Sequence, residues 1–345
     1  QGNGVILVTT KKGASGSKFG VTLNSNTTMD ALMFLPELQN TYGQGSAGNA
    51  ATSLADMVSS SWGPVANGDA QLYYDGTQKA YTARPDNVKN FFETGVKTIN
   101  SIAIDASTAT TDYRFSYTNN KTEGVLPGSS LKSHNFNLRG SSTLSDKLSI
   151  DTKVTFFSQN IEGRGRSGAE GIMGVIHQMP RTVATADLMN YQMDNPSNAA
   201  EYMSISVVGK GKMGANPYWM MLHDKDEDTR ERIFGFSKIN YKFTDWLSGF
   251  IRVGADITSA SSYYVRQAGH HFYASGRLGR SNSKSGELNS EFLLTAKQDL
   301  TSDINMVLNV GGNMSKRTYQ GNSMFGESFK IPSKPFFSNT NVNNF

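Results

Sequence analysis

Residues 247 to 258 read Leu-Ser-Gly-Phe-Ile-Arg-Val-Gly-Ala-Asp-Ile-Thr. Apolar residues occupy odd positions, namely Leu247, Ile251, Val253 and Ile257. Polar residues alternate with them at even positions, namely Ser248, Arg252, Asp256 and Thr258. In a β-strand, residues two apart point to the same face, so this stretch has one apolar and one polar face. Soluble strands usually have about 5 to 6 residues, whereas a tilted strand needs about 9 to 11 to cross a bilayer. The stretch therefore predicts a membrane-spanning strand.

The same alternation recurs along the chain and is joined by connections of two kinds. Four hydroxyl-aspartate pairs mark tight corners, because an Asp side chain can hydrogen-bond the backbone two residues on: Thr111-Asp112, Ser145-Asp146, Thr244-Asp245 and Ser302-Asp303. The other connections are long, at about residues 30 to 95, 120 to 131, 159 to 228 and 260 to 286. Short periplasmic turns at one rim and long outer loops at the other are typical of outer-membrane barrels. The sequence thus predicts an all-β, antiparallel transmembrane β-barrel with long extracellular loops.

Composition excludes several other classes of protein. No stretch among the 345 residues approaches the about 18 consecutive apolar residues of a membrane-spanning helix. The absence of cysteine excludes a disulfide framework, a zinc-thiolate site and a cysteine nucleophile. The net charge of +4 arises from 33 basic and 29 acidic residues without a basic block, so we expect no nucleic-acid partner.

Five short motifs occur in an order that resembles one known family. They are residues 1 to 13 (QGNGVILVTTKKG), 61 to 64 (SWGP), 85 to 95 (PDNVKNFFETG), 216 to 219 (NPYW) and 241 to 247 (YKFTDWL). Together with the strand pattern, they resemble the SusC/RagA family of TonB-dependent outer-membrane transporters, from the first residue to about residue 317.

The resemblance implies a plugged barrel of roughly 22 strands, of which this chain holds about nine. Residues 1 to 13 would be the C-terminal end of the plug domain. Residues 14 to 345 would be the N-terminal portion of the barrel, incomplete at its C-terminus. A first strand from Lys18 to Met29 would begin that portion.

The resemblance also implies import of oligosaccharides, or of peptides, across the outer membrane of a Gram-negative, Bacteroidetes-like cell. The implied partners are a SusD-like surface lipoprotein, outer-membrane lipid and the TonB/ExbB/ExbD complex, which would act through the missing N-terminal parts. We expect no cofactor. One alternative is a structural or adhesive β protein, such as a soluble sandwich whose apolar faces meet in a shared core. An outer-membrane hydrolase is disfavoured, because the sequence shows no nucleophile elbow and no placed Ser/His/Asp set.

Aromatic residues in the outer loops are the candidate ligand-binding residues, because exposed rings can stack on the apolar faces of sugars. The candidates are Trp62, Tyr73, Tyr74, Trp219 and Tyr273, with Tyr81 and Phe272 beside them. These rings could instead anchor large loops or form the aromatic girdles of a barrel. Few clustered charges in the loops slightly favour a neutral oligosaccharide.

Metal binding is not expected. Asp224 to Asp228 resembles the start of a calcium loop, but Thr229 and Gly235 occupy the places where the motif needs Gly and Glu. We therefore interpret this stretch as a solvated acidic loop end, with a looser surface calcium site as the alternative. Adjacent His270 and His271 would point to opposite faces of a strand, which disfavours a shared metal.

Overall fold

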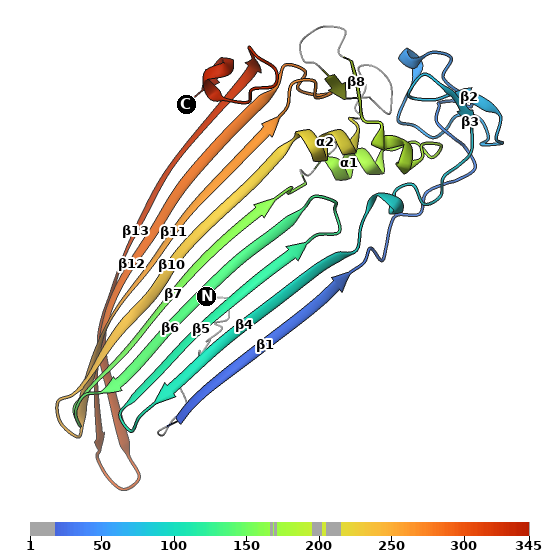
Figure 1. Cartoon of the computed structure of the whole chain (residues 1–345). Coiled ribbons are helices and arrows are strands. Elements are labelled where there is room, and N and C mark those ends of the chain that lie inside the picture. Colours follow the sequence, from blue (N-terminus) through green and yellow to red (C-terminus); the bar gives the residue numbers. More distant parts are fainter. Residues whose placement is uncertain (1–17, 166–167, 169–170, 195–201, 205–214, 345) are drawn as a thin grey trace.

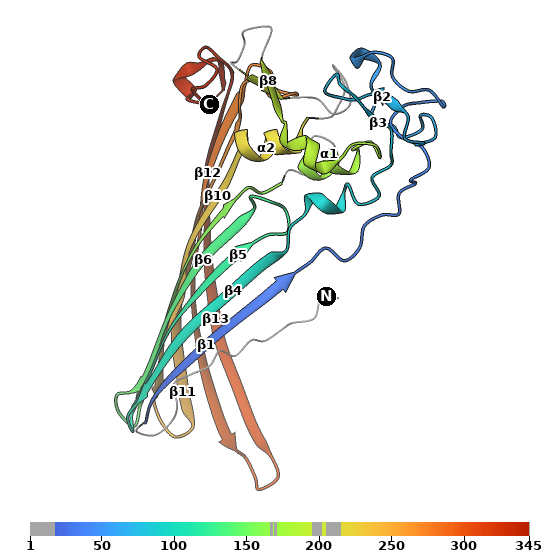
Figure 2. The ribbon, with the colours of Figure 1, turned by 45° about the vertical axis from the view of Figure 1, so that its right-hand side comes forward.

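The computed structural model describes residues 18–165, 168, 171–194, 202–204 and 215–344. Its main feature is one antiparallel sheet of ten strands in the order β1-β4-β5-β6-β7-β10-β11-β12-β13-β14. The sheet curves into an open wall with a convex and a concave side (Figures 1 and 2). The predicted all-β, antiparallel fold class is thereby confirmed, with ten strands where about nine were expected. Residues 1 to 13, interpreted as the end of a plug, lie outside the described residues.

The wall strands lengthen from 13 residues in β5 to 25 in β13, whereas the last strand, β14, has only 5. Their bounds are β1 Lys18–Asp30, β4 Gly95–Ser107, β5 Thr111–Glu123, β6 Ser130–Thr143, β7 Leu148–Glu162, β10 Lys225–Lys242, β11 Leu247–Arg266, β12 Arg277–Asp299, β13 Asn305–Phe329 and β14 Thr340–Asn344. Short turns join β4 to β5, β6 to β7, β10 to β11 and β12 to β13, all at one rim (Figure 1). This confirms the expected contrast between a rim of short turns and a rim carrying long loops.

The corner residues act differently from the prediction, which assigned the turn-closing bond to the aspartates. The hydroxyl oxygen of Ser145 accepts from the backbone nitrogen of Lys147 at 3.3 Å, and that of Thr244 accepts from Leu247 at 3.0 Å. A hydroxyl can make the same local bond as an Asp side chain. Asp245 instead points into solvent and pairs with Lys242.

Two predicted loops are in large part strand, so their expected bounds were wrong. The link between β5 and β6 is residues 124 to 129 only, and the link between β11 and β12 is residues 267 to 276 only. Strand β11 has 20 residues and β12 has 23. At residues 259 to 262 of β11 and 279 to 286 of β12, both faces carry small or polar residues, so the alternation that marks a strand disappears from the sequence although backbone pairing continues.

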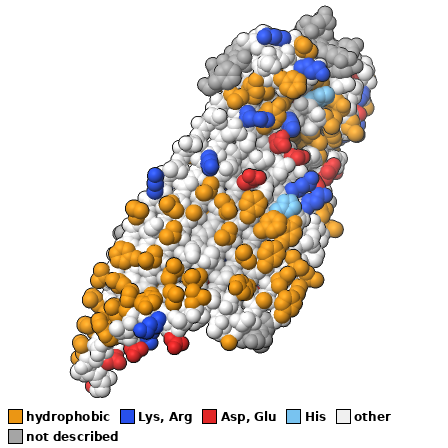
Figure 3. All heavy atoms as spheres, turned by 60° about the vertical axis from the view of Figure 1, so that its left-hand side comes forward, with side chains coloured by type: hydrophobic (Ala, Val, Ile, Leu, Met, Phe, Trp, Pro, Cys, Tyr) orange, Lys and Arg blue, Asp and Glu red, His pale blue; other side chains and the backbone are white. Residues whose placement is uncertain are grey.

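The two sides of the wall differ in chemistry. Figure 3 shows a broad band of apolar side chains on the convex face, bordered by scattered charged residues. Ile251, for example, is 61% exposed there. The concave face carries ion pairs between neighbouring strands: Asp105 with Arg114, Arg139 with Asp151, Arg232 with Asp256, Arg252 with Glu291, and Glu287 with Arg317. An apolar outside and a polar inside are the arrangement of a membrane barrel wall.

The long loops fold together into a small body inside the concave side (Figures 1 and 2). Its elements are η1 Leu54–Asp56, β2 Ala70–Leu72, β3 Gln78–Ala80, η2 Lys89–Phe91, α1 Ile172–His177, η3 Thr185–Met189, β8 Gln192–Asp194, β9 Tyr202–Ser204 and α2 Pro217–His223, and η4 Phe337–Asn339 lies near the C-terminus. Asn216 caps α2, because its side-chain oxygen accepts from the Tyr218 nitrogen. We call residues 31–94 and the described part of 163–224 the loop body.

The loop body contains most of the fully buried apolar side chains among the described residues. One cluster joins Met57 with Val183 and Leu188, and another joins Val88 and Phe91 with Ile176. The first and the third long connections therefore share one core. No described helix is long and apolar enough to span a membrane.

The soluble sandwich alternative does not fit this arrangement. The described strands outside the wall form only the two-stranded pairs β2-β3 and β8-β9, both within the loops. No second described sheet packs on the apolar wall face, which remains exposed at residues such as Ile251 and Val253. The shared core that a sandwich requires is absent from the described residues.

Candidate functional site

A small pocket of about 250 Å³ opens on the concave side, near the loop-bearing end of the wall. It is lined by Asp226, Tyr264, Arg266, Tyr273 and Arg277. Strand alternation places four of them on the same face as the concave-side ion pairs, and Tyr273 comes from the link between β11 and β12. The pocket thus faces the interior that the wall partly encloses, and we call it the lumen pocket.

Arg266 is the most firmly held residue of the pocket. Its side chain is only 3% exposed, and its Nη2 lies 2.7 Å from Asp226 Oδ1. Its Nη1 donates to the carbonyl oxygens of Val265 and Lys225. Asp224, at the end of α2, is also buried, with Oδ2 3.6 Å from Arg266 Nε. A buried guanidinium needs such partners, since an unpaired buried charge is strongly destabilising.

His270 connects the link between β11 and β12 to Asp224, the buried carboxylate that also lies beside Arg266. Its Nε2 lies 3.2 Å from Asp224 Oδ2, and its side chain is buried. The His270 carbonyl accepts from the Tyr273 nitrogen, and the Tyr273 carbonyl accepts from Gly276. Gly276 has a φ of +79°, and a Cβ there would lie 2.4 Å from the Phe329 ring. Glycine is therefore required at the turn that presents the Tyr273 ring to the pocket.

Arg277 forms the other side of the pocket and is less buried. Its Nε lies 3.0 Å from Glu327 Oε1. Its guanidinium carbon lies 5.7 Å from the centre of the Tyr273 ring and 5.2 Å from that of Phe325. Both distances permit cation-π attraction. Arg277 can therefore change partners at a lower cost than Arg266, and its fork of donors matches a carboxylate.

The pocket combines charges of both signs with two phenol rings. Arg277 can donate to a carboxylate or carbonyl, and Asp226 can accept from an ammonium or amide group. Tyr264 and Tyr273 add apolar ring faces and hydroxyl groups. Such a site is suited to a ligand that carries charged and amide groups.

Three of the predicted ligand-binding aromatics are buried within the loop body. Tyr73 is 7% exposed, Tyr74 is 4% exposed and Trp219 is 1% exposed. The Tyr73 hydroxyl donates to Asp187 Oδ2 at 2.9 Å, and the Tyr74 hydroxyl donates to the Asp187 carbonyl at 2.8 Å. Burial raises the pKa of both tyrosines. This burial is what the loop-anchor alternative predicts, and ligand contact by the three rings stays an untested prediction.

The remaining candidates differ in position. Tyr81 is buried, and its burial raises its pKa to about 12. Trp62 is 60% exposed, with its ring centroid 5.8 Å from that of Tyr42. Phe272 is half-buried beside His270. Tyr273 is the predicted residue that lines the lumen pocket, so the structure keeps Trp62 and Tyr273 as the accessible candidates.

The stretch from Asp224 to Asp228 was wrongly interpreted as a solvated loop end. Asp224 is buried beside Arg266 and His270, and strand β10 begins at Lys225. The alternating carboxylates reflect strand periodicity, since Asp226 and Asp228 point to the concave side. The described residues contain no group of three or more His, Asp or Glu that could hold a metal.

Sequence reasoning did not identify the charged members of the pocket. Arg266 and Arg277 lie in the stretch from 260 to 286 that was expected to be a loop, and Asp226 lies 40 residues before Arg266. The strand pairing of β10, β11 and β12 brings them together. Two arginines flanking a loop between long strands would have been the only available signal.

No protein-family model matches the chain, and no curated protein matches it either. Several solved structures, however, have a similar fold. The chain is similar to one from the RagAB peptide importer in its closed-closed state, with a TM-score of 0.66 and 14% identity, and to one from its open-open state, with 0.67 and 16%. A chain of the RagAB peptide transporter gives 0.63 and 14%. Each match covers 97% of this chain and 39% of the other. The described wall therefore has the fold of part of a transporter β-barrel.

Proposed function

We propose that the protein is part of a TonB-dependent outer-membrane importer and that the lumen pocket contacts its substrate. The observation that best supports this is the pocket itself, in which Asp226, Arg277 and Tyr273 face the concave interior beside the loop-bearing rim. The apolar convex face supports a location in the outer membrane. The fold shared with RagAB chains supports transport over an adhesive role.

Peptide is the substrate class that the pocket favours. A peptide offers carboxylates, ammonium groups and amides, which match Arg277 and Asp226. A neutral oligosaccharide would use the tyrosine rings but would offer no charged group to Arg277 or Asp226, which pair with Glu327 and Arg266 within the protein. The mixed charges reverse the slight preference for neutral oligosaccharide that loop composition suggested. Oligosaccharide remains the second candidate, supported by Tyr264 and Tyr273.

The proposal includes the partners implied by the sequence. A SusD-like lipoprotein would cover the loop-bearing rim and capture substrate, and the TonB/ExbB/ExbD complex would supply energy through parts outside this chain. The similar solved chains come from an assembly named RagAB, which supports a two-component importer. We propose no enzymatic step, no metal and no cofactor.

The test is uptake by cells that express the protein from its own gene. Labelled peptides of mixed charge and a labelled neutral oligosaccharide are supplied separately, with and without a functional TonB gene. We expect TonB-dependent peptide uptake that the Arg277→Gln variant lowers about tenfold, since hydrogen bonds to charged groups contribute about 1.5 to 3 kcal/mol. Arg280→Gln is the matched control, because Arg280 lies three residues along the same strand on the convex face.

The outcomes separate the parts of the proposal. Equal peptide uptake by both variants would remove the pocket from substrate contact. Oligosaccharide uptake that depends on the protein, without peptide uptake, would replace the substrate class. Recovery of the protein in the soluble fraction without detergent, or turnover of an ester or glycoside by the purified protein, would contradict the importer itself.

A further inference from the structure

The convex face changes from apolar to polar at one row of paired residues. Phe156, Ile233 and Ile257 are cross-strand neighbours on β7, β10 and β11 and belong to the apolar band. The next row on the same face, two residues along each strand, is Ser158, Glu231, Ser259, Lys284 and Gln320. The row beyond it is Asn160, Thr229, Ser261, Asn282 and Asn322.

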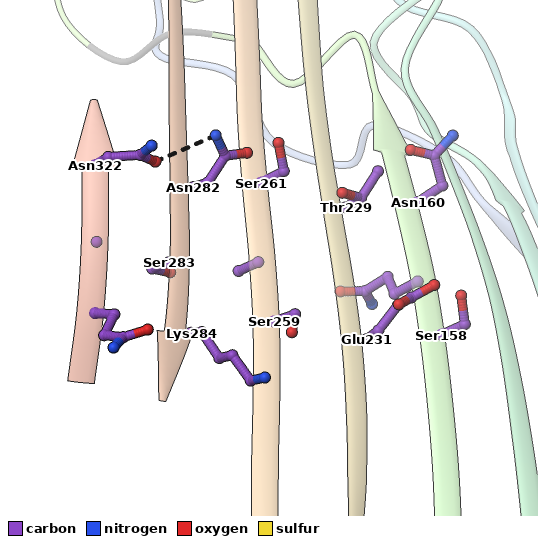
Figure 4. A pocket seen from close by; sticks show the side chains of 14 residues that line it. Ser158, Asn160, Thr229, Glu231, Ser259, Ser261, Asn282, Ser283, Lys284 and Asn322 are labelled. Atoms are coloured by element: carbon purple, nitrogen blue, oxygen red, sulfur yellow. Dashed lines mark hydrogen bonds between the residues drawn. The ribbon is translucent and has the colours of Figure 1, made fainter. Parts of the chain in front are cut away.

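These two rows line a shallow hollow of about 690 Å³ on the outside of the wall. Figure 4 shows their side chains in adjacent columns on β13, β12, β11, β10 and β7. The charged residues in the lining are Glu231 and Lys284, and the other lining residues are uncharged. Lys284 makes no ion pair within the part of the chain that the structure describes. The hollow is thus rich in hydroxyl and amide groups and poor in charge.

The hydrogen-bonding capacity of the hollow is only partly used. Asn160 donates from its amide nitrogen to Glu162 Oε1 at 2.9 Å, while its buried Oδ1 has no partner among the described residues. Asn282 donates to Asn322 Oδ1 at 3.3 Å. Because Asn160 Oδ1 is enclosed by the protein, a ligand would instead hydrogen-bond the more accessible side chains of the two rows, such as the exposed Ser259.

The position of the hollow determines which part of a membrane lipid can contact it. Successive residues on one face of a strand are separated by about 7 Å. A lipid whose acyl chains lie on Ile233 and Ile257 must therefore place its headgroup against Glu231 and Ser259. The tight-turn rim is the periplasmic one in barrels of this kind, which puts the hollow at the outer leaflet.

We propose that this hollow binds the saccharide headgroup of a glycolipid in the outer leaflet. Sugar hydroxyls donate and accept hydrogen bonds, which matches the Ser, Thr and Asn side chains. A bare phosphate headgroup would instead require a cluster of Arg or Lys, and Lys284 is the lone cation in the lining. The site is separate from the lumen pocket, since the two lie on opposite faces of the wall. The inference rests on the proposed outer-membrane location.

The test uses the protein purified from cells in mild detergent and placed in vesicles of phosphatidylethanolamine. Rough lipopolysaccharide or phosphatidylglycerol is added at equal mole fraction, and retained lipid is measured by native mass spectrometry. The double variant Ser259→Leu with Asn282→Leu should retain about fivefold less lipopolysaccharide, because it removes hydrogen-bonding groups from the hollow. The matched control is Thr258→Leu with Ser281→Leu, since each residue adjoins a replaced one in sequence, points to the concave side and does not line the hollow.

Each outcome decides the proposal. Selective retention of lipopolysaccharide that the double variant loses and the control keeps would support it. Equal loss in both variants, no loss in either, or equal retention of phosphatidylglycerol would overturn it, as would a second protein in place of lipid on this face. Arg277→Gln should leave lipid retention unchanged, so failure of the peptide proposal is distinguishable from failure of this one. Recovery in the soluble fraction would remove the shared premise.

Discussion

The imidazole ring of His223 stacks on the indole ring of Trp219, with centroids 4.0 Å apart and planes 26° from parallel. Both residues belong to α2, of which His223 is the last residue, and the indole is fully buried in the loop body. Burial lowers the pKa of His223, and the neighbouring Asp224 only partly opposes this. The neutral imidazole is therefore the form that this stack accommodates.

The loop body should lose stability on mild acidification. Because the pKa of His223 is lower in the folded state than the usual value of about 6.5, its contribution is complete above that pH. It declines as the pH falls through the lowered folded pKa, since the unfolded state binds more protons. Hydrogen exchange at residues 216–223, corrected for intrinsic rates, should show weaker protection at pH 5.5 than at pH 7.5. The His223→Phe variant should lose this difference, whereas His177→Phe, at an exposed position, should keep it.

Replacing Trp219 should destabilise the loop body, whereas replacing Trp62 should not. Trp219→Ala leaves a large cavity in a buried cluster and should cost about 3 to 5 kcal/mol. That cost should expose the loop body to limited proteolysis. Trp62→Ala removes a ring that is 60% exposed and should leave the cleavage pattern unchanged. If both variants were cleaved alike, Trp62 would be a structural anchor as well.

Arginine substitutions should distinguish the two faces of the wall. Ile251→Arg and Val253→Arg place a charge on the apolar convex face and should cost about 2 to 4 kcal/mol near the bilayer midplane. Ser248→Arg points to the concave side and should cost less. Unfolding from lipid vesicles by urea measures the difference. Similar costs at all three positions would contradict the assigned orientation.

Arg181 should hold the two long connections of the loop body together. Its Nη2 donates to Asn40 Oδ1 at 2.8 Å and to the Pro85 carbonyl at 2.7 Å, and it also bonds Asn87. Burial lowers its pKa. Arg181→Met leaves the side-chain oxygen of the buried Asn87 without its partner, which costs about 1 to 3 kcal/mol, whereas Asn40 and Pro85 are exposed.

Proteolysis of the Arg181→Met variant should therefore cleave both connections faster. Arg84→Met supplies the control, because Arg84 is exposed nearby on the first connection. Faster cleavage of only one connection would show that the two do not depend on each other.

The wall could be predicted from sequence wherever one of its faces meets an apolar environment. Ile251 and Arg252 differ in chemistry because their faces differ, and this contrast marks the strand. At Ser259 and Ser261 the strand continues, but both faces are polar, so the expected loop began too early. The first strand was placed within one residue of its end at Asp30.

The candidate site was less predictable, because it depends on contacts between residues distant in sequence. Tyr73 and Trp219 are aromatic residues in loops, which is equally typical of ligand contact and of a loop core. Only tertiary packing distinguishes the two, and here it buries both rings. Tyr273 was identified by its type and position, whereas its partner Arg277 lay in a stretch that no periodicity marked as strand.

The concave-side ion pairs have a consequence for strand register. Each joins two adjacent strands, as Arg139 does with Asp151 and Arg252 does with Glu291. A slip of one residue in strand pairing would turn a strand's charged face toward hydrocarbon. Such a register would therefore be disfavoured in a wall that spans a membrane. The ion pairs between adjacent strands therefore favour the register in which the charged faces of those strands all point to the concave side.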